Sequence, residues 1–173
     1  MLLVVDVQVD VVANAWDRDR IVANVALAVS RARAARVPVV WVQHADDELP
    51  RDTPGWRWVP ELTLAPGEVR IHKHHNSAFE DTALLALLDR AEVSHLFLAG
   101  AATNWCIRAT AFGALERGFD LTLIGDAHTT TDLKLAPETE IPARLAIEDL
   151  NAAIQWLDYP GRKNRVASAA EVF

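Results

Sequence analysis

Short runs of apolar residues alternate along the chain with longer segments in which apolar side chains recur every three or four positions. Residues 2–5 form the first run, which is too short for a helix before the polar Asp6 and therefore predicts a fully buried strand. Residues 17–36 show the other pattern, that of an amphipathic helix, which Pro38 ends. By the same criteria we expect strands at 39–42, 69–72, 96–99 and 119–124, a sixth strand or a tail at 165–172, and helices at 81–90, 105–116 and 141–157.

This alternation of strands and helices runs through the whole sequence. It is typical of an α/β fold, in which helices cover both faces of a parallel sheet in three layers, α/β/α, here with six strands. A chain of 173 residues is long enough for one such domain, and no repeat or second domain is visible, so we expect a single domain over residues 1–173. Two segments, 44–67 and 128–140, read as loops, and the length of the first is typical of the rim of a binding site.

Cys106 is the only cysteine, and it lies where the strand at 96–99 turns through Gly100 into the helix at 105–116. The N-terminus of a helix stabilises negative charge, so this placement predicts a solvent-reachable thiol with a lowered pKa. The same backbone N–H groups can receive an oxyanion. A lone cysteine is more often a small buried hydrophobic residue, so other residues must decide between the two roles.

Two further residues stand at predicted strand ends. Asp6 follows the first strand and Lys73 follows the third, and in open parallel sheets ligands bind at the carboxyl ends of the strands. A carboxylate can take the proton of a thiol, while a lysine keeps that carboxylate ionised and favours the thiolate. Asp6 alone could be a turn residue and Lys73 alone a solvated strand end, but together with Cys106 they suggest a catalytic set.

Composition narrows the class of partner. The net charge is −7 and no basic block occurs, which argues against nucleic acid and against an anionic membrane surface. No apolar run reaches membrane-spanning length, no signal-peptide pattern is present, and a single cysteine fits a reducing compartment, so we expect a cytoplasmic protein. Neither a dinucleotide fingerprint nor a phosphate loop occurs, and we expect a small-molecule substrate, no cofactor, and a homo-oligomer, dimer or tetramer.

Four segments carry a resemblance to a known family: LLVVDVQVD at the start, HKHHNSAF in the middle, GAATNWCIRAT around the cysteine, and GDAHTT after the fifth strand. In order and spacing they resemble the isochorismatase-like cysteine hydrolase superfamily, which includes nicotinamidases and N-carbamoylsarcosine amidases. The resemblance implies a six-stranded parallel sheet and a catalytic triad of Asp6, Lys73 and Cys106. It also implies a non-proline cis peptide bond at Ala101–Ala102 and an oxyanion hole made by the backbone N–H groups of Ala102 and Cys106.

The resemblance favours hydrolysis of a C–N bond in a small amide or ureide. Asp6 would take the thiol proton, Cys106 would attack the carbonyl carbon, and water would then hydrolyse the thioester. Two alternatives stay open. One is hydrolysis of a vinyl ether of the isochorismate type, which uses the aspartate and lysine without the cysteine. The other is a catalytically silent binding protein with the same fold.

Departures from the family pattern bear on the substrate. Relatives that act on isochorismate carry an arginine two residues after the lysine, where this chain has His75. An imidazole cannot make the bidentate carboxylate contact of a guanidinium, so we expect a small substrate that is uncharged near His75. Val11 stands where the family has a phenylalanine, which either widens the pocket or moves the aromatic wall elsewhere, to Trp16 or Trp56. The residues we expect to bind substrate are Gln8, His44, Trp56, His75 and Trp105.

Nicotinamidases also hold a divalent metal through an aspartate and several histidines after the second strand. This chain offers only His44, Asp46 and Asp47 there, which is a weak ligand set. We therefore expect no required metal, with His44 as a pocket residue instead.

Overall fold

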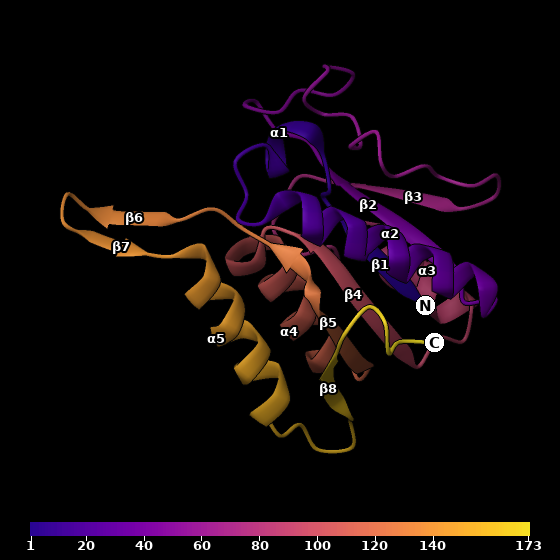
Figure 1. Cartoon of the computed structure of the whole chain (residues 1–173). Helices are drawn as coiled ribbons and strands as arrows, with labels where there is room; N and C mark the ends of the chain where they lie inside the picture. The colour runs from indigo at the N-terminus through magenta and orange to yellow at the C-terminus, as the bar shows by residue number, and fades with distance from the viewer.

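Six parallel strands form the central sheet of the computed structural model, which describes all residues from 1 to 173 (Figure 1). The predicted α/β fold with a six-stranded parallel sheet is therefore confirmed. In spatial order the strands are β3 (Val69–Lys73), β2 (Val39–His44), β1 (Leu2–Val5), β4 (His95–Ala101), β5 (Asp120–Thr129) and β8 (Asn164–Ala167). Because β1 lies near the middle of the sheet, between β2 and β4, the residue that follows it lies at the centre of the carboxyl edge.

Two apolar cores lie on the two faces of this sheet. On one face Leu2 and Val4 pack with α2 (Arg18–Ala34), and on the other Leu3 and Val5 pack with helices from the second half of the chain. Successive side chains of β1 thus enter opposite cores, which is why the strand reads as a continuous apolar run without alternation. The helices on the second face are α3 (Leu84–Arg90), α4 (Arg108–Glu116) and α5 (Ala143–Trp156) (Figure 1).

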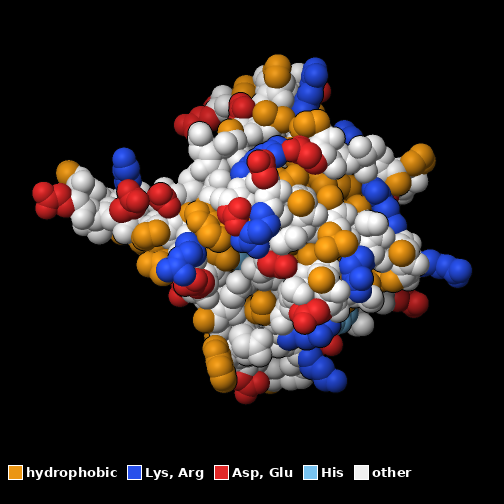
Figure 2. Space-filling model, in the orientation of Figure 1, with side chains coloured by type: hydrophobic (Ala, Val, Ile, Leu, Met, Phe, Trp, Pro, Cys, Tyr) orange, Lys and Arg blue, Asp and Glu red, His pale blue; other side chains and the backbone are white.

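The structure differs from the sequence prediction at residues 128–140, expected as a loop. There β6 (Leu133–Ala136) and β7 (Thr139–Ile141) form an antiparallel hairpin that projects from the body of the molecule, with charged side chains along it (Figure 2). Nearly all of its side chains are exposed, and its strands have only four and three residues, so the brief alternation of Leu133, Lys134 and Leu135 is too short to predict a strand.

Smaller differences occur at element ends. The helix predicted at 105–116 opens with a π-helical turn, η1 (Thr103–Ile107), before α4 begins. A short helix, α1 (Val9–Val12), follows the first strand, and the last strand ends at Ala167. No helix in the structure combines the length and the apolarity needed to cross a lipid bilayer.

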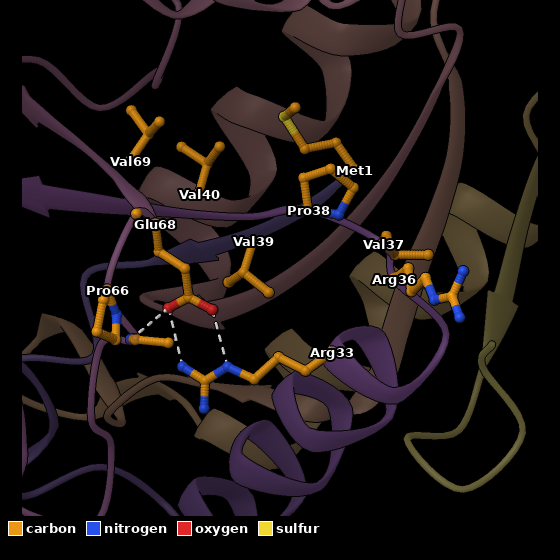
Figure 3. Close-up of a pocket in the computed structure, with 12 residues that line it drawn as sticks. Met1, Arg33, Arg36, Val37, Pro38, Val39, Val40, Pro66, Glu68 and Val69 are labelled. Carbon is orange, nitrogen blue, oxygen red and sulfur yellow. Dashed lines mark hydrogen bonds and ion pairs between the residues drawn. The ribbon is translucent and has the colours of Figure 1, made fainter.

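A cavity of about 380 Å³ lies where β2 and β3 begin, at the edge of the sheet opposite the carboxyl ends of the strands (Figure 3). The polar side chains there bind one another. Arg33 donates to both carboxylate oxygens of Glu68 at 2.8 Å, and Trp41 Nε1 donates to Glu68 at 2.7 Å. These contacts, above all those from Arg33, lower the pKa of Glu68 to about 2. They fasten the end of the 44–67 segment to α2.

The Glu68→Gln variant should be less stable than the parent at neutral pH, by about 1–3 kcal/mol, the range for hydrogen bonds to a charged group. The pKa of Glu68 is about 2 in the folded chain against an ordinary 4.5, so its stabilisation is complete above pH 4.5 and disappears as pH falls toward 2. Thermal unfolding of both proteins across this range should show their midpoints converging in acid. A gap that stays constant would mean that the charge of Glu68 does not stabilise the fold.

Candidate active site

Three side chains meet at the carboxyl edge of the sheet: Asp6 after β1, Lys73 at the end of β3, and Cys106 within η1 after β4. Gly100 permits this arrangement because β4 passes very close to β1 at this point. Its φ is +128°, and a Cβ there would lie 2.0 Å from the carbonyl oxygen of Val5. Only glycine allows this close approach directly before the turn that carries the thiol.

Lys73 connects the other two residues. Its Nζ lies 2.6 Å from Oδ2 of Asp6 and 3.2 Å from Sγ of Cys106, and it donates to the carbonyl oxygen of His75 at 3.1 Å. Asp6 and Lys73 are both fully buried, and Oδ1 of Asp6 accepts no hydrogen bond. The structure thus brings the three predicted residues together as a buried ion pair against a thiol.

The electrostatics of the thiol contradict the sequence prediction of a lowered pKa. Burial, and after it the charge of Asp6, raise the pKa of Cys106 to about 12 against the opposing effect of Lys73. Burial also raises the pKa of Asp6, against the effect of Lys73. In the free protein the proton of Cys106 therefore stays on sulfur, and burial makes the neighbouring carboxyl group of Asp6 more basic as well.

The backbone before the thiol forms a compact turn. The Ala101–Ala102 peptide bond is cis, and the carbonyl oxygen of Ala102 accepts hydrogen bonds from the N–H groups of Trp105 and Ile107, each at 3.1 Å. These two hydrogen bonds hold the backbone turn that carries Cys106.

His44 extends the ion pair toward solvent. Lys73 Nζ lies 3.4 Å from His44 Nδ1, and Nε2 of His44 lies 2.8 Å from Oδ2 of Asp46. A cavity of about 250 Å³ opens beside it, lined by His44 and Asp46 together with Asp10, Val11, Glu48 and Leu49. His44 thus lines a cavity beside the ion pair, and its role in binding a substrate stays a prediction.

The same contacts argue against a metal at this place. Both ring nitrogens of His44 face other groups, and the second carboxylate oxygen of Asp46 accepts from the N–H groups of Glu48 and Leu49. No cluster of three or more histidine, cysteine, aspartate or glutamate side chains is placed to hold an ion. The residues present do not fit the metal site of the nicotinamidases.

We expect any hydrolytic activity of this chain to survive exhaustive chelation, because His44 and Asp46 offer no vacant ligand set. The activity should be compared before chelation, after it, and after Zn²⁺, Mn²⁺ or Fe²⁺ is returned. Activity that chelation removes and a metal restores would show His44 to be a ligand.

Two residues predicted to bind substrate have structural roles instead. Gln8 is completely buried, and its amide nitrogen donates to the carbonyl oxygens of His44 and Trp56 at 3.0 and 2.9 Å. Trp56 is only 8% exposed and stacks on His72, with ring centroids 5.7 Å apart. Both hold the 44–67 segment against the sheet. The side chain of Trp16, the other candidate for an aromatic wall, lies against the guanidinium of Arg20.

His75 and Trp105 remain as candidates on the surface of the site. His75 is exposed, and its carbonyl oxygen binds Lys73. Trp105 directly precedes Cys106 and is 50% exposed. Of the three tryptophans considered for the site, Trp105 is the one with an exposed side chain.

Sequence reasoning missed two residues that tie the end of β5 to the cysteine turn. His128 Nδ1 lies 2.9 Å from Thr103 Oγ1, and Thr130 Oγ1 donates to Asn104 Oδ1 at 2.6 Å. Both residues belong to the GDAHTT segment, which indicated that they lie near the site but not which residues they contact. A second missed feature is a cavity of about 370 Å³ beside the turn, lined by Asn104 and Arg108, by the hairpin residues Leu133 and Ile141, and by Leu145, Ala146 and Asp149 of α5.

Comparison with known proteins places the chain in a family. A family model described as the isochorismatase domain matches residues 1–146. A streptothricin hydrolase of Streptomyces noursei is 36% identical over 164 residues, which cover 90% of this chain and 63% of that protein. The ureidoacrylate amidohydrolase RutB of Enterobacter sp. (strain 638) is 29% identical over 169 residues, covering 79% of this chain and 71% of that one.

Solved structures agree with the fold. An isochorismatase from Pseudomonas putida KT2440 superposes with a TM-score of 0.88 at 25% identity, covering 99% of this chain and 89% of that chain. The chain nevertheless spans only 63% and 58% of the lengths of two streptothricin hydrolases that it matches.

Proposed function

The chain belongs to the isochorismatase family, and we propose that it hydrolyses a C–N bond of a small amide or ureide through a thioester on Cys106. One observation carries this proposal: a single buried ammonium, Lys73 Nζ, lies 2.6 Å from the carboxylate of Asp6 and 3.2 Å from Sγ of Cys106. The names of the two relatives, a hydrolase and an amidohydrolase, support the same reaction class.

The chemistry starts with a proton transfer. Asp6 takes the thiol proton as Cys106 attacks the carbonyl carbon, and Lys73 stabilises the sulfur as charge develops on it. The N–H groups of Ala102 and Cys106 hold the resulting oxyanion. Asp6 then gives the proton to the departing nitrogen, which breaks the C–N bond and leaves an acyl group on sulfur.

A second half-reaction restores the enzyme. Asp6, again a carboxylate, takes a proton from water, and the hydroxyl oxygen attacks the thioester carbon. The oxyanion forms in the same place, the C–S bond breaks, and the thiolate recovers its proton from Asp6. The products are an amine or ammonia and a carboxylic acid, or a carbamic acid when the substrate is a ureide.

For the substrate we propose a small molecule that is uncharged near His75 and packs on Trp105. His75 supplies one donor and one acceptor, which suits an amide or a hydroxyl group better than a carboxylate. A preference of the parent protein for carboxylate-bearing amides over matched neutral ones, by about tenfold or 1.4 kcal/mol, would contradict this.

We also propose that the protein self-associates. Its support is a set of large apolar side chains exposed on the hairpin and α5, including Leu135, Leu145 and Trp156. Light scattering should give the mass of a dimer or tetramer, and a monomer mass at working concentration would contradict this.

The test of the reaction class is a panel of small amides, ureides, esters and a vinyl ether, given to the parent protein and to Cys106→Ala. We expect the parent to turn over at least one amide or ureide and the variant to turn over none. Asp89→Asn, on the exposed surface of α3, is the control for effects of mutation and purification that do not involve the site, and it should keep the activity of the parent. Turnover of the vinyl ether alone, unaffected by Cys106→Ala, would instead support the isochorismate-type reaction.

A further inference from the structure

A buried hydrogen-bond chain stands behind the cysteine turn. His128, near the end of β5, and Thr103, the first residue of η1, are both completely buried. His128 Nδ1 lies 2.9 Å from Thr103 Oγ1, and His128 Nε2 lies 3.0 Å from Asn151 Oδ1 on α5. These hydrogen bonds therefore link β5, α5 and the turn that carries Cys106.

The partners of His128 fix where its proton lies. Asn151 donates its own Nδ2 to the carbonyl oxygen of Gly125 at 3.0 Å, so its Oδ1 must be an acceptor. Nε2 of His128 therefore carries the hydrogen, and the bare Nδ1 accepts from the hydroxyl of Thr103. Burial lowers the pKa of His128 to about 4, which is consistent with a neutral ring at neutral pH.

The packing around His128, Thr103 and Asn151 leaves these side chains little room to move. A Cβ at Gly125 would lie 3.0 Å from Asn151 Oδ1 and 2.5 Å from a methyl carbon of Val166, so the strand and α5 are in close contact there. Oδ1 of Asn104, the residue after Thr103, accepts a hydrogen bond from the hydroxyl of Thr130 at 2.6 Å. Two successive residues of the turn are thus held from the end of β5 and the residue that follows it, and none of these side chains hydrogen-bonds to Asp6, Lys73 or Cys106.

We propose that His128 is a positioning residue, which through its acceptor contact with Thr103 holds the η1 turn so that the sulfur of Cys106 lies against Lys73. The inference rests on the proposed function for its kinetic consequence, but the placement of the thiol can be measured without a substrate. Misplacement of a reacting group by about 1 Å can cost on the order of 10²-fold in rate.

The protein offers a comparable histidine–threonine pair as a control near the start of β4 and β5, whose other ends lie next to His128 and Thr103. His95 Nε2 of β4 lies 2.8 Å from Oγ1 of the buried Thr122 in β5. Thr122→Val and Thr103→Val each remove the hydroxyl of a buried threonine that contacts a histidine, and in the control that hydroxyl also accepts from Nε of Arg165 at 3.1 Å. Only Thr103 lies next to the cysteine turn, so a merely structural role predicts similar effects in both variants.

The experiment measures the rate of Cys106 alkylation by iodoacetamide, with thermal unfolding of each variant. We expect Thr103→Val and His128→Phe to slow alkylation about tenfold, and the double variant to be no slower than either single one. His128→Asn, whose Oδ1 can take the place of Nδ1 toward Thr103, and Thr103→Ser should both recover most of the rate. Thr122→Val should react within about twofold of the parent, even where its unfolding temperature falls.

Where the panel identifies an amide that the parent hydrolyses, the same variants should lower kcat with KM nearly unchanged. Alkylation of Thr103→Val at the parental rate, or an equal loss in Thr122→Val, would overturn the positioning role. If the parent hydrolyses nothing in the panel, the proposed function fails, while the alkylation rates still decide the role of His128.

Discussion

Replacing Asp6 with asparagine should leave the fold intact and lower kcat by about 10²–10⁴-fold, the usual cost of removing a general base. Asparagine has the same shape but cannot take the proton of Cys106. The loss should appear in kcat, because the reacting proton moves only during the chemical step. Turnover by Asp6→Asn close to that of the parent would show that another group is the base.

The same variant, Asp6→Asn, should make the thiol of Cys106 more reactive toward alkylation although it hydrolyses the substrate more slowly. In the parent, burial and then the charge of Asp6 raise the pKa of Cys106 to about 12. Without that charge the ammonium of Lys73, 3.2 Å from the sulfur, faces the thiol with no competing anion. The pKa of Cys106 should fall, so that alkylation at neutral pH becomes faster while hydrolysis becomes slower.

Ultraviolet titration of the thiolate against pH measures this shift, and Asp89→Asn provides the same change of charge away from the site. A thiol pKa that is the same in Asp6→Asn and in the parent would mean that Asp6 and Cys106 do not interact.

Replacing Lys73 with methionine should both abolish turnover and destabilise the fold. The carboxylate of Asp6 would remain buried without its partner, and breaking a buried ion pair from one side costs about 3–5 kcal/mol. In the double variant Asp6→Asn with Lys73→Met no buried charge remains, so most of this stability should return although activity does not.

Denaturant unfolding of the parent, the two single variants and the double variant measures these differences. Burial raises the pKa of Asp6, so the destabilisation in Lys73→Met should grow as pH rises above the ordinary value of 3.8 and shrink in acid. A Lys73→Met protein as stable as the parent at neutral pH would show that Asp6 is neutral there.

The sequence predicted the positions of the site residues better than their physical properties. Asp6 could be placed because it follows a run that can only be a buried parallel strand, and Lys73 because it comes at the end of the third predicted strand, since parallel strands end at one edge. Gly100 marked the turn to Cys106. The pKa of that thiol could not be predicted, because it depends on how burial and Asp6 compare with the helix terminus and Lys73.

Side chains that serve the fold from inside the site were also beyond prediction. Gln8 and Trp56 have polar or aromatic groups suited to a ligand, yet the backbone of the 44–67 segment uses the first and His72 the second. His128 has its role only because η1 begins beside β5, which is a matter of packing. The β6–β7 hairpin could not be predicted because its strands are short and bury almost nothing.

The central claim is that Cys106 carries the acyl group during turnover. The most direct measurement mixes the protein with an amide it hydrolyses, stops the reaction with acid within the first turnovers, and determines the mass of the peptide that contains Cys106. We predict a fraction of that peptide heavier by the acyl group of the substrate, absent when Cys106 is alanine. Continued hydrolysis of the same amide by Cys106→Ala, with no adduct on the parent protein, would contradict the claim.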